Sequence, residues 1–249
     1  MLTINKRGMA YVVTGVLAAL VAVSAPSGGF VGAVAAETTK ASAAKQQGLV
    51  DGARSTIEAF SSDHQLTWVR DNMKDAKAVL IIPEQVKGGL MIGGSGGSGV
   101  ALARTTDGTW SYPAFFTMGS ITFGFQAGGQ VSEIVLMAMT QKGADALKGD
   151  SFKLGGDVSV AAGPVGAGAK GQLADVVAFS RAKGLYGGLN VEGAMIKSRS
   201  EWNHAYYGKT VSMAEILDGK ASNPHADGLR SALDKIRTAT ATGDARIGG

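Results

Sequence analysis

The sequence predicts one α+β domain built on a curled, barrel-like antiparallel β-sheet of many short glycine-rich strands, with N-terminal, internal and C-terminal helices. Glycine is the first reason, because 32 of the 214 residues after position 35 are glycines, about twice the usual share of roughly 7%. They alternate with Val, Ile, Leu and Phe over 88–193, and glycines inside strands are typical of bulges, bends and close backbone approach. Helical periodicity on either side of this region is the second reason.

The first 35 residues read as a secretory signal peptide. Lys6 and Arg7 precede a mainly apolar run over 9–23, and Ala33-Val34-Ala35 forms an A-x-A cleavage site. We expect cleavage after Ala35 or Ala36. The alternative is an uncleaved membrane anchor, but the run is short for a span of about 20 residues. We therefore expect an exported protein, periplasmic or secreted, with peripheral membrane association. The expected segments are a signal peptide at 1–35, a flexible segment at 36–44, one domain at 45–238 and a flexible tail at 239–249.

Charge and cysteine content exclude several classes of function. The chain has 24 basic and 20 acidic residues, and without Lys6 and Arg7 the exported part has 22 against 20. It contains no block of five or six like charges, so we expect no nucleic-acid partner. It contains no cysteine, which excludes disulfides, thiolate metal sites, a catalytic cysteine and a lipidated N-terminal cysteine.

In the first half of the domain, apolar residues recur every three or four positions over 49–60, which predicts an amphipathic helix. Asp63 is placed to cap a second helix that continues to Met73. Residues 78–82 are typical of a buried strand that ends at Pro83. Asp107-Gly108 lies between two strand-like runs and predicts a hairpin over 100–112, with a sharp strand bend over 93–99 leading into it.

The second half continues the strand pattern around a short helix. Thr140 is placed to cap a helix over 141–148, and Leu229, Leu233 and Ile236 predict an amphipathic helix after Asn223-Pro224. The remaining strands are expected at 120–127, 131–139, 152–161, 173–182 and 188–198.

Three glycine motifs resemble catalytic or nucleotide-binding signatures. Residues 94–99 spell the dinucleotide fingerprint G-x-G-x-x-G, and Ser95 is the centre of a G-x-S-x-G nucleophile elbow. Both motifs require a helix directly after the glycines, whereas a strand-like run follows Gly99, so we expect no nucleotide site. A serine hydrolase using Ser95 is kept as an alternative. Residues 163–170 resemble a Walker A loop but have Gly171 where Ser or Thr must bind magnesium, so a tight turn is expected there.

Metal and cofactor sites are not expected. His64, His204 and His225 are scattered, without a partner at i+4 or a nearby acid pair at ligand spacing. Two basic pairs are more informative, because Arg181 and Lys183, and likewise Lys197 and Arg199, have the period-two spacing of one strand face. A hairpin around Gly187-Gly188 would bring the pairs into one patch, in which each cation contributes about 1 kcal/mol near an anionic lipid surface. The alternative is a solvated outer face.

Several blocks together resemble the SYLF domain family of lipid-binding domains. They are "GGSGGSGVALARTTDGTWSYPAFF", "GFQAGGQVSEIVLMAMT", "LGGDVSVAAGPVGAGA", "AFSRAKGLYGGLNVEGAMI" and "NHAYYG", spread over about 45–220. The resemblance implies a non-enzymatic domain that binds acidic phospholipids through basic residues and an amphipathic N-terminal helix, here the helix with Lys40, Lys45 and Arg54. Asp51 and Glu58 share that helix. Yeast members also bind actin, a property that we do not expect in an exported bacterial member.

The sequence therefore predicts an exported domain that binds anionic phospholipid headgroups and needs no cofactor. The alternative is a structural or interaction protein of the cell envelope with a protein partner. The expected headgroup contacts are Lys170, Arg181, Lys183, Lys197 and Arg199.

Overall fold

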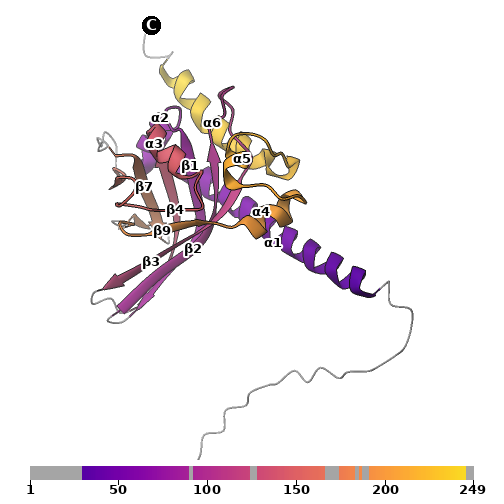
Figure 1. Cartoon of the computed structure of the whole chain (residues 1–249). Coiled ribbons are helices and arrows are strands. Elements are labelled where there is room, and N and C mark those ends of the chain that lie inside the picture. The colour runs from indigo at the N-terminus through magenta and orange to yellow at the C-terminus, as the bar shows by residue number, and fades with distance from the viewer. Residues whose placement is uncertain are drawn as a thin grey trace, which may run out of the picture.

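A computed structural model of the chain describes residues 30–89, 92–123, 128–165, 174–182, 185–186 and 191–244. These residues form one curled sheet with helices packed along it (Figure 1). The helices are α1 (Phe30–Ser62), η1 (His64–Leu66), α2 (Thr67–Asn72), α3 (Gln141–Ala146), α4 (Ser200–Tyr207), α5 (Met213–Leu217), η2 (Pro224–Ala226) and α6 (Asp227–Asp244). The strands are β1 (Ala78–Gly89), β2 (Ile92–Ala103), β3 (Ala114–Phe123), β4 (Gly128–Ala138), β5 (Ser151–Lys153), β6 (Val160–Ala162), β7 (Val176–Ala182), β8 (Leu185–Tyr186) and β9 (Met195–Ser198).

The strands form a half-barrel in the order β5-β9-β3-β2-β1-β4-β7-β6, and β8 pairs with β7 off this path. All neighbours pair antiparallel except β6 and β7, which are parallel. The first and last strands of this order, β5 and β6, are consecutive in the chain, and Leu154 bridges Val158 in the turn between them. The sheet therefore curls until its two ends approach each other, which confirms the predicted fold class.

The inner face of the curl holds one of two hydrophobic cores. Leu80 and Phe116 from the central strands lie in the same cluster as Phe152 and Val158 from the two ends of the sheet. Ile216 of α5 packs into this cluster and is fully buried. The inner core is therefore enclosed by the curl itself.

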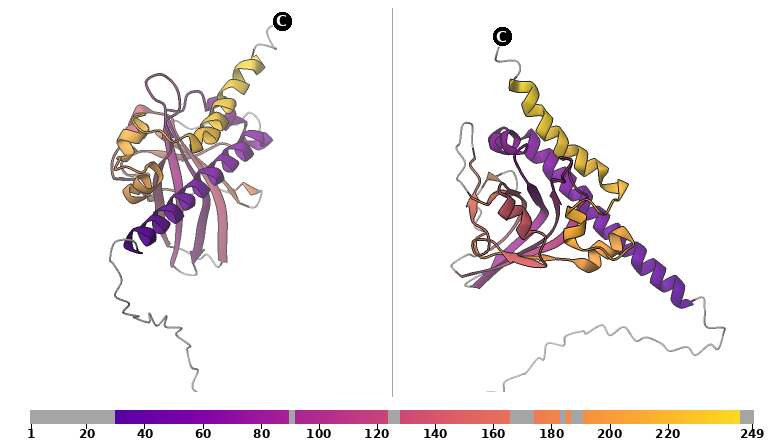
Figure 2. Two further views of the ribbon diagram at one scale, coloured as in Figure 1. Left: turned by 90° about the vertical axis from the view of Figure 1, so that its right-hand side faces the viewer. Right: turned by 45° about the horizontal axis from the view of Figure 1, so that its top comes forward.

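The outer face carries the second core, which helices cover. Figure 2 shows α1 and α6 lying together diagonally across this face. The predicted stripe of α1 supplies Val50, Ile57 and Phe60, all buried against outer-face residues such as Val79 and Phe115. Alternate residues of each central strand thus enter different cores, as the two-residue period of a strand requires.

Local sequence signals fix several element ends as predicted. The Asp63 side chain accepts a hydrogen bond from the backbone amide of Gln65 at the start of η1. Thr140 Oγ1 accepts one from the Gly143 amide at the start of α3. Gly108 has a φ of 79° in the turn after Asp107, a left-handed conformation that glycine adopts at no steric cost. The predicted helix N-termini and the Asp-Gly turn are confirmed.

Other elements differ from the predictions. Strand β1 continues through Pro83 to Gly89, because the pairing registers shift at Ile81–Gln85 and the bulge accommodates a residue without an N–H. The sequence predicts a strand bend at 93–99, but these glycines lie inside β2, one continuous strand that pairs with β1 and β3 on its two sides. Helix α1 begins at Phe30 and includes 36–44, and α6 extends to Asp244.

Candidate functional site

The structure separates Arg181 from Lys197 and Arg199, which the sequence predicts to lie in one patch. Arg181 lies at the end of β7, which pairs with β4, β6 and β8, whereas Lys197 lies on β9, which pairs with β3 and β5. Strands β3, β2, β1 and β4 lie between β9 and β7 in the sheet order, so β7 and β9 do not pair as the predicted single patch requires; residues 187–188 lie outside the described ranges. The separation results from pairing between strands that are far apart in the sequence, which no local pattern encodes. Lys170 and Lys183 lie outside the described residues.

Arg181 is engaged in a contact that joins the sheet to α1. Its Nε donates to Glu133 Oε2 at 2.7 Å, and its guanidinium lies 5.8 Å from the centre of the Phe60 ring. Glu133 also accepts a hydrogen bond of 3.1 Å from the hydroxyl of buried Thr56 in α1. Arg181 thus links β7, β4 and α1, and its guanidinium contacts other residues of the protein.

Lys197 and Arg199 lie at the other side of the sheet, beside α4. The Arg199 guanidinium stacks 4.2 Å above the Trp202 ring, and Lys45 Nζ from α1 lies 5.5 Å from the centre of the same ring. Lys197 precedes Arg199 by two residues on the exposed end of β9. We call Lys45, Lys197, Arg199 and Trp202 the tryptophan cluster.

The chain builds this cluster from three separate segments. Arg199 is the N-cap residue of α4, so Trp202, three residues later, lies one turn away and beneath its guanidinium. Contacts between α1 and α4 bring Lys45 to the same indole, and a 3.0 Å hydrogen bond from Tyr206 Oη to Gln47 Oε1 joins the two helices. The cluster therefore rests on two packed helices and a paired strand.

The electrostatics of the cluster are mainly positive, with one acid. Arg199 Nε lies 2.6 Å from Glu201 Oε1. A hydrogen bond from its own backbone amide and, secondarily, Arg199 lower the pKa of the Glu201 carboxyl, so it is ionised at neutral pH. Among the described residues, no ion pair engages Lys45 or Lys197. Two ammonium groups and a half-buried indole are therefore presented together, a combination suited to the polar boundary of a membrane.

Local sequence patterns predict Lys197 and Arg199 as headgroup contacts, without Lys45 or Trp202. The i, i+3 spacing of Arg199 and Trp202 at a helix start was the available signal. The contribution of Lys45 depends on helix packing. Arg54, another basic residue of α1, forms an i, i+4 ion pair of 2.8 Å with Glu58.

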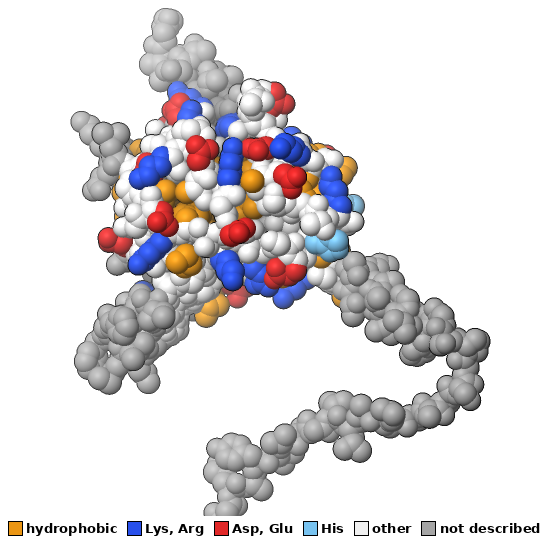
Figure 3. All heavy atoms as spheres, in the orientation of Figure 1, with side chains coloured by type: hydrophobic (Ala, Val, Ile, Leu, Met, Phe, Trp, Pro, Cys, Tyr) orange, Lys and Arg blue, Asp and Glu red, His pale blue; other side chains and the backbone are white. Residues whose placement is uncertain are grey.

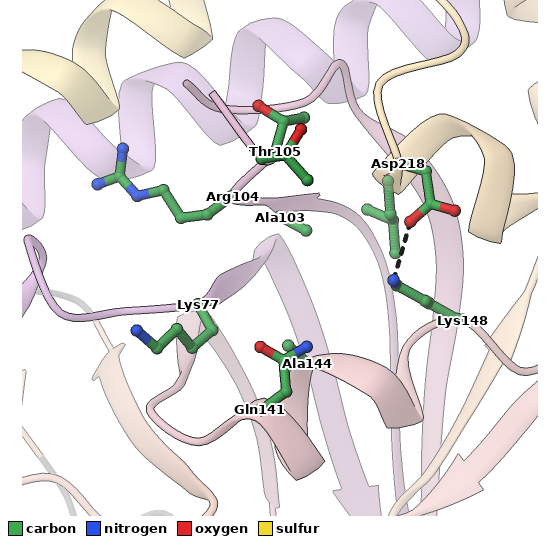
Figure 4. A pocket seen from close by; sticks show the side chains of 10 residues that line it. Lys77, Ala103, Arg104, Thr105, Gln141, Ala144, Lys148 and Asp218 are labelled. Carbon is green, nitrogen blue, oxygen red and sulfur yellow. Dashed lines mark ion pairs between the residues drawn. The ribbon is translucent and has the colours of Figure 1, made fainter. Parts of the chain in front are cut away.

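A separate cavity of about 400 Å³ lies between the sheet, α3 and α5 (Figure 4). Three cations line it, but the side chains of Lys77 and Arg104 extend to one side, away from Lys148. Arg104 stacks 3.9 Å above Trp110, and Lys148 Nζ is 2.8 Å from Asp218 Oδ1. The cavity therefore does not converge positive charge on one point.

The face of the molecule seen in Figure 3 carries charges of both signs, and its acidic and basic side chains are interspersed. Within the described ranges, no group of three or more His, Cys, Asp or Glu residues could hold a metal ion. No helix in the same ranges combines the length and apolar character needed to cross a bilayer.

Ser95 lies inside strand β2, not at a strand-to-helix turn. Its Oγ is 2.8 Å from Ser120 Oγ on β3 and accepts a 3.2 Å hydrogen bond from Gln85 Nε2 on β1. The hydroxyl is thus part of a polar ladder across three strands, and the local geometry of a nucleophile elbow is missing at this position.

Comparisons with known proteins relate this chain to one family. Residues 119–236 match the Ysc84 family model, described as "Las17-binding protein actin regulator". LAS seventeen-binding protein 3 of Saccharomyces cerevisiae is 39% identical over 167 residues, which are 63% of this chain and 36% of the relative. SH3 domain-containing YSC84-like protein 1 of Bos taurus is 33% identical over 164 residues, 63% of this chain and 48% of the relative. The rat protein of that name is 31% identical over 175 residues, 68% and 52%. The chain thus spans between about a third and a half of the curated relatives it matches, and the printed name of the yeast relative describes a binding protein.

Proposed function

The chain belongs to the SYLF domain family, the family of the Ysc84 model, and from that premise we propose that it binds anionic phospholipid headgroups at a membrane surface without catalysing a reaction. The observation that carries the proposal is the tryptophan cluster. Trp202 has one cation 4.2 Å and another 5.5 Å from its ring centre. Lys197 adds a third charge on the adjoining strand.

Each part of the cluster has a distinct role in this proposal. The ammonium groups of Lys45 and Lys197 attract phosphate oxygens, and each contributes about 1 kcal/mol near an anionic leaflet. The guanidinium of Arg199 shares its charge with Glu201, so its main roles are hydrogen bonding and holding the indole. The Trp202 ring is half-buried against the outer core and is suited to the headgroup layer.

The proposal revises the headgroup contacts expected from sequence. Lys197 and Arg199 are retained, and Lys45 joins them. Arg181 is assigned to the contact with Glu133 and α1. Lys170 and Lys183 lie outside the described residues and have no assigned role. We also propose that the leader directs export, so that the membrane surface concerned is periplasmic or extracellular.

Vesicle sedimentation tests this function. The chain without residues 1–35 is mixed with phosphatidylcholine vesicles, or with vesicles containing phosphatidylglycerol or cardiolipin, at low and high salt. We expect binding to the anionic vesicles only, weakened by salt because counterions screen exposed charges. Equal and negligible sedimentation with all vesicles would contradict the proposal.

Charge reversal locates the contact. Lys197→Glu removes one cation and adds one anion, which weakens the free energy of membrane binding by about 2 kcal/mol. The partition coefficient should therefore fall about thirtyfold. Lys74→Glu is the matched control, since Lys74 is also exposed but follows α2, which is not one of the elements that build the cluster. Equal losses for both variants would indicate a general charge effect and would remove the assignment to the tryptophan cluster.

A protein partner in the cell envelope is the second candidate function. The family description and the yeast relative's name both refer to binding of a protein, Las17. Under this alternative the chain is indifferent to vesicles of every composition. Its Lys197→Glu variant then loses a protein partner recovered by cross-linking in cells, while sedimentation stays at the background level for both variants.

A further inference from the structure

One row of the outer sheet face is left uncovered by α1 and is mainly apolar. The row runs perpendicular to the strands, and its members pair directly with one another across five strands. In order they are Val131 (β4), Val86 (β1), Gly96 (β2), Gly119 (β3) and Met195 (β9). At about 4.8 Å between strands, the row is about 19 Å long.

The large side chains of this row are unusually exposed. Val86 is 53% exposed, and Val131 and Met195 are each 45% exposed. They form, with Val165, the set of large hydrophobic residues that stand out to solvent in the described ranges. Three of these four therefore lie in one line on one face, which single scattered hydrophobic residues do not do.

The two glycines between them are not required by internal packing. A Cβ atom at Gly96 would meet only the Met118 carbonyl oxygen, at 3.8 Å, and one at Gly119 only the Ser95 carbonyl oxygen, at 3.9 Å. Both positions are exposed. A glycine inside a strand costs stability, yet here it makes room for no neighbour within the described chain. The result is a flat floor between Val86 and Met195.

A groove of about 560 Å³ lies along this floor and ends at α1. Leu49 of α1 forms its wall, and Val86, Gly96 and Thr117 are among the residues that line it. Backbone groups in the floor are not left open, because β1, β2 and β3 each pair with a neighbour on both sides. Because these backbone groups bond to neighbouring strands and not to water, the floor can enter an apolar medium without leaving them unpaired.

Cations lie along the edge of this surface and connect it with the tryptophan cluster. Lys45 precedes Leu49 by one helical turn on α1. Lys197 pairs with Thr117, and exposed Lys153 pairs with Met195. Glu84 is the acid that also lines the groove. A second acid, Asp157, accepts a hydrogen bond from the Lys153 amide, so three cations face two acids around the apolar row, and this excess of positive charge matches an anionic leaflet above its acyl chains.

We infer that this row, with the groove beside it, is the face of the protein that enters the headgroup–acyl boundary of an anionic membrane. The inference rests on the proposed lipid-binding function and adds the orientation of the protein on the membrane. Val86, Val131 and Met195 contact acyl chains, and Lys45, Lys153 and Lys197 lie at the level of the phosphates. The sheet, and not the N-terminal half of α1, makes the apolar contact.

The absence of cysteine in the sequence permits a direct test with single labels. An environment-sensitive fluorophore is attached to Val86→Cys, Met195→Cys, Ala44→Cys or Ser231→Cys. Ala44 reports on the exposed N-terminal part of α1, and Ser231 is an exposed control on α6. With phosphatidylglycerol vesicles we expect a blue shift and quenching by acyl-brominated lipid at 86 and 195, no such quenching at 44, which lies beside Lys45 at the phosphate level, and no change at 231.

The outcomes separate the inference from the function on which it rests. If the protein sediments with anionic vesicles while labels 86 and 195 stay unchanged, the orientation is wrong and lipid binding stands. A response at 44 alone would assign the contact to α1 instead. If labels 86 and 195 are shielded without vesicles and light scattering reports a dimer, the face binds a second copy. Absence of sedimentation with every vesicle removes both proposals.

A second variant tests the energetics of the row. Val86→Asn with Val131→Asn removes two exposed apolar side chains, so its native fold should be retained. We expect about tenfold weaker partition into anionic vesicles, with the salt dependence unchanged because no charge is altered. Unchanged partition of a folded double variant would overturn the inference.

Discussion

Substituting alanine for two glycines of β2 should have opposite effects on stability, although the positions are three residues apart. Gly99 faces the inner core, where a Cβ would lie 2.4 Å from the Ile81 carbonyl oxygen, 2.7 Å from Phe116 Cζ and 2.9 Å from Ile82 Cγ1. Gly96 faces outward, and its Cβ would have a single neighbour at 3.8 Å. An added methyl group therefore clashes severely at Gly99 and meets no close neighbour at Gly96.

The magnitudes follow from these distances. At Gly99 the nearest atom belongs to the backbone of a paired strand, which cannot move without disturbing β1, so Gly99→Ala should destabilise the fold by about 3 kcal/mol or more. Gly96→Ala should stabilise it by about 0.5 kcal/mol, because alanine restricts the unfolded chain more than glycine does. The two variants should thus differ by about 3.5 kcal/mol.

Urea unfolding followed by tryptophan fluorescence measures this difference. Trp110 is fully buried and reports loss of the core. We expect a large fall in the midpoint for Gly99→Ala, a small rise for Gly96→Ala and the wild-type slope for both. Equal midpoint shifts would refute the assignment of the two positions to opposite faces, and with it the description of the uncovered row.

Three further predictions follow from other contacts. Arg181→Ala should lower the free energy of unfolding by about 1–2 kcal/mol, since it leaves the partly buried Glu133 without its ion pair, and should leave vesicle sedimentation of the folded protein unchanged; a selective loss of sedimentation would return Arg181 to the headgroup contacts. Hydrogen bonds from the Thr140 hydroxyl and then from the Ser159 amide and hydroxyl lower the pKa of Asp175 below its ordinary 3.8. The ionised Asp175 carboxylate therefore stabilises the fold above about pH 4, and this stabilisation is lost as the pH falls. Asp175→Asn should be less stable than the wild type at pH 7, and its free energy of unfolding should fall less than that of the wild type between pH 4 and pH 2 in urea titrations. Parallel pH curves for the two proteins would refute this. Export should leave a mature chain that begins at Ala36 or Glu37, which N-terminal sequencing of the protein from its native host checks; an intact Met1 would contradict it.

Local patterns predicted the elements whose cause is local. The stripe on α1 buries Ile57 and Phe60 because a helix places residues three and four apart on one face. Thr140 caps α3 because its hydroxyl needs to reach only the Gly143 amide. Similar local grounds predict that a strand ends at Pro83, but register shifts in the pairing of β1 with both neighbours let the strand continue.

The amino-acid sequence by itself determined the α+β class, the glycine-rich curled sheet, the helix caps and the family, since these depend on composition, short-range hydrogen bonds and patterns along the chain. Tertiary structure alone decided which strands are neighbours, and so placed Arg181 and Lys197 on strands that do not pair and joined Arg181 to Glu133. It also brought Lys45 to Trp202 and Val86 into line with Met195. Such contacts join residues far apart in the chain, and their geometry is set by the packing of whole elements, which spacing along the sequence does not record.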